Sequence, residues 1–324
     1  HLETIWTKVT SLFDTIKEWF EDSLLYHYIG FCIWAIEDSK HNAEQRRKQI
    51  NDWYNQWMEC GVDKEKFLTS IKNYIRDKII DCERDNLNKL HFEDIYQKSR
   101  IRKILLLHNV QTIITQQEVQ TDKYKLASFH KFPFHLFKKE TWNVEHIDSA
   151  TTNELKQTRD QKPWLRAALA SGKLDYDEKI KKYLDKKCTD IPDFQEIYDK
   201  VMSQFPSDDL LCETVQIDDI VDNERMHIWN LALLDESTNK SYRNSIFCVK
   251  RSFVINKEQG KHCHISDEGK VVIDGKAIAF VPICTKQAFL KYYTEDANAL
   301  LAWSRTDSKK YLEDITQKLE DFLK

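Results

Sequence analysis

The sequence predicts an α+β protein that is predominantly α-helical. Glycine supplies only 6 of the 324 residues and proline only 5, whereas an average composition of about 7% glycine would give roughly 23 glycines. Turns and loops depend on these two residue types, so their scarcity favours long helices. A helical apolar period runs through the first 117 residues, and short extended segments follow it. We therefore expect a helical N-terminal domain and a second domain that contains strands.

The first predicted domain, residues 1–120, is a helical linker or scaffold. Ile5, Val9, Phe13, Ile16 and Phe20 recur at steps of three and four residues, which is typical of an amphipathic helix. Asp63 is a suitable N-cap for one of the later helices. Those further helices are predicted over residues 26–34, 43–58, 64–82 and 99–116.

The second predicted domain, residues 121–324, has mixed α and β character. The helical pattern weakens over residues 117–140, where Phe132-Pro133-Phe134 favours an extended backbone. Two strands are predicted over residues 142–147 and 228–234, and the chain between them reads as a helical insertion at about 150–225. The predicted elements that follow are a loop over 235–240, a helix over 242–251, a hairpin over 270–280 and closing helices over 285–293, 296–303 and 308–323. Asp274-Gly275 fits the two-residue turn of that hairpin.

Composition excludes several classes of protein. The six glycines form neither GxxxxGK nor GxGxxG, so this stretch of chain holds no nucleotide-binding loop of those types. Eight cysteines lie far apart without a CxxC pair, which indicates reduced thiols and a cytoplasmic protein. No apolar run is long enough for a membrane span. The net charge of −4 still permits a local basic groove for nucleic acid.

Three motifs stand in a strand, strand and helix order. They are WNVEHI at 142–147, NLALLDESTNKSYRN at 230–244, and FCVKR at 247–251. This combination resembles the ββα-metal fold of HNH (His-Me finger) nucleases. More closely, it resembles the C-terminal nuclease domain of GmrSD-type restriction endonucleases, which are modification-dependent enzymes of phage defence. WFEDSLLYHYIGF and IRKILLLHNVQTI in the helical part also resemble the region that joins the two catalytic halves of that family.

The resemblance implies a metal-dependent endonuclease that hydrolyses DNA phosphodiester bonds. Such chemistry needs a base for the attacking water and a divalent cation for the transition-state charge. His146 would be the base, and Glu145 and Asn239 would bind the cation, Mg²⁺ or else Mn²⁺, through oxygen. Asn230 would pin the loop between strand and helix by bonding backbone groups. Lys250 and Arg251 would hold a phosphate.

The partners implied are DNA, with or without modified bases, and an N-terminal domain that hydrolyses nucleotides. Because the chain begins at His1 inside a helical pattern, we expect it to be a fragment that lacks that domain.

Two local features qualify this expectation. Successive side chains of a regular strand point to opposite faces, so Glu145 and His146 can serve one site only if the strand bends or bulges at 145–147. The family usually has a proline soon after the histidine, whereas this chain has Asp148-Ser149-Ala150. Asp148 thereby becomes a spare candidate ligand.

Other interpretations remain open at this level. The finger could be catalytically degenerate and only bind nucleic acid or dock a partner domain, or it could cut RNA. His227, just before the second strand, is the first alternative to His146 as base. His262-Cys263-His264 suggests zinc only weakly, because no second ligand pair accompanies it.

Overall fold

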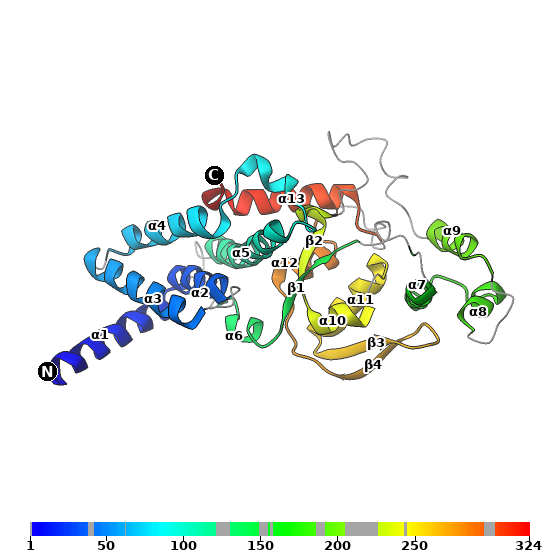
Figure 1. Ribbon diagram of the computed structural model, residues 1–324, viewed down its shortest axis with the longest axis horizontal. Helices are drawn as coiled ribbons and strands as arrows, with labels where there is room; N and C mark the ends of the chain where they lie inside the picture. The colour runs from blue at the N-terminus through cyan, green and yellow to red at the C-terminus, as the bar shows by residue number, and fades with distance from the viewer. Residues whose placement is uncertain are drawn as a thin grey trace. The chain divides into compact units, whose positions relative to one another are not determined.

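The computed structural model describes residues 2–37, 42–61, 63–120, 130–148, 155, 158–185, 192–204, 226–242, 245–294 and 302–324. These residues form two compact units (Figure 1). Unit 1 comprises residues 1–87, 95–134 and 315–324, and unit 2 comprises residues 88–94 and 135–314. The division after residue 134 falls inside the region where the helical pattern weakens. Two short segments depart from a simple division of the chain: residues 88–94 belong to unit 2 and residues 315–324 belong to unit 1, and the sequence pattern did not reveal either.

Unit 1 is helical. Trp19 is buried where it meets the rings of Trp57 and Phe67, so the amphipathic first helix packs one edge onto the helices that follow it. Asp63 accepts a hydrogen bond from the Lys66 amide and begins one of these helices, as predicted. The elements are α1 (Leu2–Glu21), α2 (Ser23–Glu37), α3 (Asn42–Glu59), α4 (Lys64–Tyr74), the π-helix η1 (Ile75–Ile80), the 3₁₀ segment η2 (Arg84–Lys89), which ends in unit 2, α5 (Ile95–Gln120) and the 3₁₀ turn η6 (Glu320–Phe322).

One histidine of unit 1 is held neutral inside the core. His27 is fully buried; its Nδ1 lies 2.7 Å from the Ser23 carbonyl, and its Nε2 accepts the Phe132 amide at 2.9 Å. Burial lowers the pKa of His27 to about 4, an effect that the Ser23 carbonyl opposes and the nearby Lys131 charge reinforces. His27 therefore contributes structure rather than chemistry.

The free energy of unfolding should consequently fall at mildly acidic pH. A depressed histidine pKa means that the unfolded chain takes up the proton first, so stability is complete above pH 6.5 and is lost as the pH falls towards about 4. This separation corresponds to about 3 kcal/mol. Denaturant titrations between these pH values test it. His27→Gln should flatten the dependence, and His130→Gln, at an exposed position, should not; equal slopes in all three proteins would contradict the assignment.

Unit 2 is built around an antiparallel strand pair. Strand β1 (Trp142–His146) pairs with β2 (Leu231–Asp235) in the register Trp142↔Asp235 to His146↔Leu231. The second strand thus begins three residues later than predicted, because residues 228–230 form the 3₁₀ turn η5 (Ile228–Asn230). On β2, the Leu231 carbonyl accepts a hydrogen bond from the Tyr311 hydroxyl, and the Leu233 carbonyl accepts one from the Thr285 hydroxyl. Side chains of helical residues rather than a third strand therefore satisfy these two carbonyls.

The remaining helices of unit 2 surround or follow this pair. Asp177 caps one of the insertion helices by accepting from the Ile180 amide. Part of the predicted insertion, and part of the predicted helix over 296–303, lie outside the described residues. The elements are α6 (Phe134–Phe137), α7 (Thr158–Ala170), α8 (Glu178–Leu184), α9 (Phe194–Gln204), α10 (Glu236–Tyr242), α11 (Phe247–Glu258), α12 (Ile283–Phe289) and α13 (Arg305–Lys318), which ends in unit 1.

Two predictions for unit 2 were wrong in detail. Residues 236–242 form helix α10 instead of a loop, because the Asp235 carboxylate accepts the Thr238 amide and caps a new helix. The following helix, α11, accordingly starts at Phe247 and runs to Glu258.

The hairpin also differs from the prediction. Strand β3 (Lys261–Ile265) pairs with β4 (Val271–Lys276), and the turn lies between them, where Gly269 adopts a φ of 72°. Asp274 and Gly275 lie within β4, opposite a register shift between His262 and Cys263. All five residues of β3 precede position 270, so the predicted hairpin over 270–280 was wrong: its proposed turn lies inside β4, and only its first half coincides with a strand.

Candidate functional site

The candidate site lies at the end of the β1–β2 pair, where β1 carries Glu145 and His146. The pairing is regular through His146, and the Ile147 amide donates to the Asn230 carbonyl at 2.8 Å. The predicted bend or bulge at 145–147 is therefore absent, because the ladder with β2 continues past the histidine. In a regular strand the two side chains point to opposite faces. Their contacts agree: Glu145 meets Lys250, and His146 meets Phe92 and Met226.

His146 is half-buried beside two apolar side chains. Its ring lies 5.2 Å from the Phe92 ring, edge to face, and its Nε2 lies 3.1 Å from the sulfur of Met226. A thioether is only a weak hydrogen-bond acceptor. Proton transfer at this nitrogen would require the Met226 sulfur to move aside.

Asn230 fastens the chain that follows the histidine. Its side chain is buried; Oδ1 accepts the Asp148 amide at 2.9 Å, and Nδ2 donates to the Asp148 carbonyl at 2.8 Å. Asn230 therefore bonds backbone groups, but those of the segment after β1 rather than those of the loop between strand and helix that the prediction named. Asp148, the spare candidate ligand, is thus held at the same end of the strand pair.

Lys250 differs from its predicted role. The side chain is wholly buried, and its ammonium donates to the His146 carbonyl at 2.6 Å and to Glu145 Oε1 at 3.4 Å. Burial lowers the pKa of Lys250, while the charges of Glu145 and Asp148 oppose that shift. An ammonium in this position neutralises Glu145 and is shielded from a phosphate of bound nucleic acid. Phosphate contact by Lys250 would require the side chain to leave its buried partners.

Arg251 and Asn239 are the two predicted site residues with uncommitted polar groups. Within the described ranges, the Nε of Arg251 is buried without a hydrogen-bond partner. The half-buried amide of Asn239, on α10, likewise has no side-chain partner among the residues that the structure describes. Helix α10 contacts both β1 and β2. The Arg251 Nε is shielded from solvent, so it could meet an incoming ligand only after a rearrangement, whereas the Asn239 amide is half-buried.

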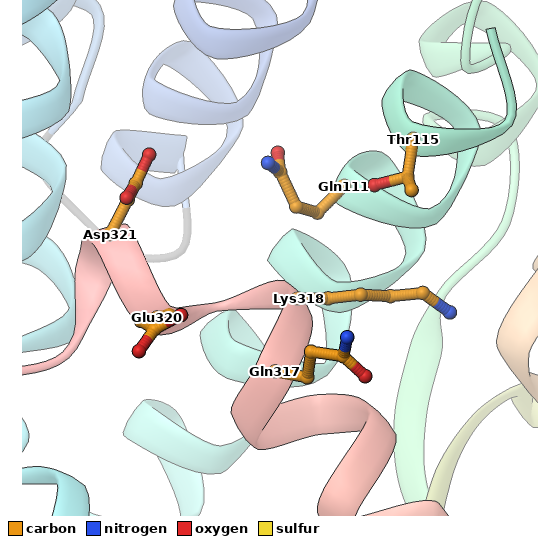
Figure 2. A pocket seen from close by; sticks show the side chains of 6 residues that line it. All are labelled: Gln111, Thr115, Gln317, Lys318, Glu320 and Asp321. Atoms are coloured by element: carbon orange, nitrogen blue, oxygen red, sulfur yellow. The ribbon is translucent and has the colours of Figure 1, made fainter. Parts of the chain in front are cut away.

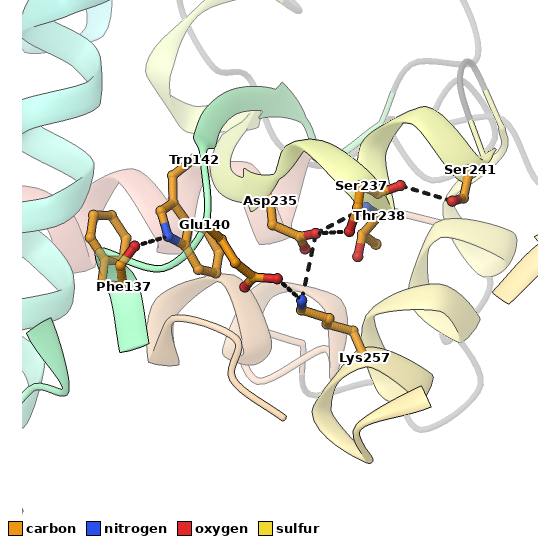
Figure 3. Close-up of polar contacts among 8 residues, drawn as sticks. All are labelled: Phe137, Glu140, Trp142, Asp235, Ser237, Thr238, Ser241 and Lys257. Atoms are coloured by element: carbon orange, nitrogen blue, oxygen red, sulfur yellow. Dashed lines mark hydrogen bonds and ion pairs between the residues drawn. The ribbon is translucent and has the colours of Figure 1, made fainter. Parts of the chain in front are cut away.

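The sequence pattern missed a buried charge cluster at the other end of the strand pair (Figure 3). The ammonium of Lys257 forms an ion pair with Glu140 and lies 3.6 Å from Asp235 Oδ1. The same oxygen accepts hydrogen bonds from the Ser237 hydroxyl and the Thr238 amide, and it thereby caps α10. Burial raises the pKa of Glu140, with a further contribution from Asp235, against the effect of Lys257. An acid at a strand end followed by Glu-Ser-Thr was the available signal, since it is typical of a helix N-cap.

The histidines that weakly suggested a zinc site bond to a carboxylate instead. His262 and His264 direct their Nδ1 atoms at opposite oxygens of Asp274, at 2.6 and 2.7 Å, and no group of three His, Cys, Asp or Glu residues in the described part of the chain could hold a metal. The weak zinc interpretation gains no support.

A hollow of about 350 Å³ in unit 1 is lined by polar side chains (Figure 2). Its two acids, Glu320 and Asp321, already pair with Arg84 and Lys72. We find no catalytic group there.

Comparisons with protein-family models, curated proteins and solved structures give no match to this chain. No helix among the described residues is long and apolar enough to cross a membrane.

Proposed function

We propose that this chain is a metal-dependent endonuclease of the His-Me finger type that hydrolyses DNA as part of phage defence. The observation that carries the proposal is connectivity: β1, with Glu145 and His146, pairs with β2, and β2 continues directly into α10, with Asn239. Since α10 contacts both strands, the three predicted site residues belong to elements that touch. The strand, strand and helix order is also the order in which the motifs occur in the sequence.

The side chains available fit a hard divalent cation. The carboxylate of Glu145 and the amide of Asn239, which has no side-chain partner among the described residues, offer oxygen donors, which Mg²⁺ prefers. When bound, Mg²⁺ would neutralise charge on the phosphate and on the leaving oxygen. Lys250 already holds a positive charge against Glu145, so a divalent cation at this carboxylate must share it with Lys250 or displace it.

The protein's own residues have distinct roles in this proposal. His146 takes the proton of the attacking water. Asn230 fixes the backbone that follows His146 through its two bonds to Asp148. Arg251, which is half-buried, binds a phosphate oxygen through its guanidinium group. DNA is the substrate and a nucleotide-hydrolysing domain is the partner that the family resemblance suggests.

The test is cleavage of matched modified plasmid, unmodified plasmid and RNA with Mg²⁺ or Mn²⁺. We expect nicking of DNA that stops when EDTA removes the metal. Glu145→Gln should need more metal for half-maximal rate, because a neutral amide binds divalent cations less well than a carboxylate. Glu236→Gln, at an acid paired with exposed Lys240, is the matched control and should behave as wild type. Metal-independent cleavage, or no cleavage of any substrate, would contradict the proposal.

A second candidate function is a module that binds nucleic acid or docks a partner without cutting. It is favoured by one observation, that Glu145 and His146 lie on opposite faces of a regular strand while Lys250 neutralises Glu145. Retained DNA binding without metal-dependent cleavage in the same assay would support this alternative.

A further inference from the structure

Helix α1 carries a row of large apolar side chains that face solvent. Thr15 and Trp19 pack into unit 1, whereas a neighbouring side of the helix remains open. The open side chains are between 45% and 84% exposed, which is unusual for such a set on one helix. They are Leu2, Ile5, Trp6, Val9, Phe13, Ile16 and Phe20. We call this set the α1 seam.

The spacing of the α1 seam is that of a coiled coil. From Leu2 to Phe20 the residues Leu2, Trp6, Val9, Phe13, Ile16 and Phe20 alternate steps of four and three. This is the a/d pattern of a heptad, in which the apolar seam meets the seam of a second helix. A helix that only covers its own domain needs a broader apolar face. The α1 seam thus predicts a helical partner.

We propose that the partner is the α1 helix of a second copy of this chain, packed antiparallel. The α1 seam is complementary to itself when reversed, because its six a/d positions are symmetric about residue 11. Reversal sets each a residue against a d residue, in the pairs Leu2 with Phe20, Trp6 with Ile16, and Val9 with Phe13. Each of the three pairs joins an aliphatic residue to an aromatic residue, and Val9 with Phe13 lies at the centre.

Charge complementarity supports the antiparallel orientation. Glu3 and Lys17 each directly follow a d residue of the seam, which places them at the flanking e positions. In the antiparallel dimer Glu3 of one copy lies beside Lys17 of the other, and this pair occurs twice. In a parallel dimer, neither Glu3 nor Lys17 would lie beside a residue of opposite charge on the other copy. The charges at the flanks therefore select one orientation.

The area and the overall charge agree with a protein partner. Trp6, Phe13 and Phe20 are 69%, 65% and 60% exposed, and aromatic side chains of about 150–250 Å² each would bury on the order of 300 Å² per copy. With the aliphatic residues, two copies approach the roughly 1,000 Å² that a specific interface needs. Helices that lie on membranes are rich in Lys and Arg, whereas α1 has two basic and four acidic residues.

Sedimentation velocity across a dilution series tests the dimer. We expect a monomer–dimer equilibrium whose dissociation constant rises at least about tenfold in Phe13→Glu, because a carboxylate then lies in the apolar seam. Val9→Glu should act in the same way. Thr7→Glu adds the same charge at an exposed position outside the α1 seam and should leave the equilibrium unchanged. Far-ultraviolet circular dichroism verifies that each variant remains helical.

Charge exchange tests the orientation. Glu3→Lys and Lys17→Glu should each weaken the dimer, and the double variant should restore it, because the pair is then reversed intact. A wild-type chain that stays monomeric at every concentration would overturn the proposal, as would a dimer that ignores Phe13→Glu or a double variant that does not recover. Binding of monomeric wild type to anionic lipid vesicles, lost in Phe13→Glu, would assign the α1 seam to a lipid surface instead.

Discussion

Replacement of His146 by alanine is expected to slow metal-dependent DNA cleavage by about 10²–10⁴-fold, which is the usual contribution of a general base. The loss should fall on the rate at saturating substrate, because the proposed role of His146 is to accept a proton rather than to bind DNA. His146→Asn should lose activity to a similar degree, since an amide fills much of the space but cannot act as a base. Initial rates of plasmid nicking measure both variants.

The control for this experiment is His135→Ala, which removes an exposed histidine from the short helix α6 in the same unit. It should cleave at the wild-type rate. Because His146 also contacts Phe92 and Met226, thermal unfolding of each variant must accompany the assay. Cleavage at the wild-type rate by both His146 variants would contradict the assignment of His146 as the base, and His227 would then be the next residue to test.

Replacement of Lys257 by methionine is expected to lower the free energy of unfolding by about 3–5 kcal/mol, the usual cost of breaking a buried ion pair. Lys257 and Asp235 are almost completely buried, and Glu140 shares the same ammonium. The variant would leave the buried carboxylate of Asp235 and the half-buried carboxylate of Glu140 without their cation. Denaturant unfolding at neutral pH measures the loss. At acidic pH the loss should shrink, because Glu140, whose pKa burial raises, takes up a proton in the folded state.

A double variant separates charge from packing. In Lys257→Met with Asp235→Asn, one buried charge is removed while asparagine still caps α10, so part of the stability should return. Lys240→Met, which removes an exposed lysine paired with Glu236, should cost no more than about 1 kcal/mol. A single Lys257→Met variant as stable as wild type would show that the cluster contributes little.

The local chemistry of several elements was readable from the sequence. Asp63 caps a helix where predicted, and the apolar period located α1, α3 and α5 to within a few residues. The first strand was placed correctly because its aromatic and β-branched residues favour an extended backbone. Helix α10 was missed although its cap is local, since the charged and polar residues that follow Asp235 also fit a loop. The β3 strand was missed because its partner lies across a turn of uncertain register.

The candidate site was predictable as residue types but not as geometry. Motif order indicated which residues meet at the end of the strand pair, and Asn230 does bond the backbone there. The direction of each side chain depends on the β1–β2 register, which is fixed by pairing between residues more than eighty positions apart. The burial of Lys250 against Glu145 likewise depends on how α11 packs, and no local pattern encodes it.

By itself, the sequence determined the helical character of the chain, the positions of most helices, the exclusion of glycine-rich nucleotide loops and the identity of the candidate base. These properties follow from composition, period and short motifs, which act over a few residues. Only the tertiary structure decided that Glu145 faces Lys250 while His146 faces Met226, that Asp235 joins a buried charge cluster, and that the apolar row of α1 is left open to solvent. Burial and side-chain direction arise from contacts between distant segments, and a periodic pattern shows that a face is apolar without showing what covers it.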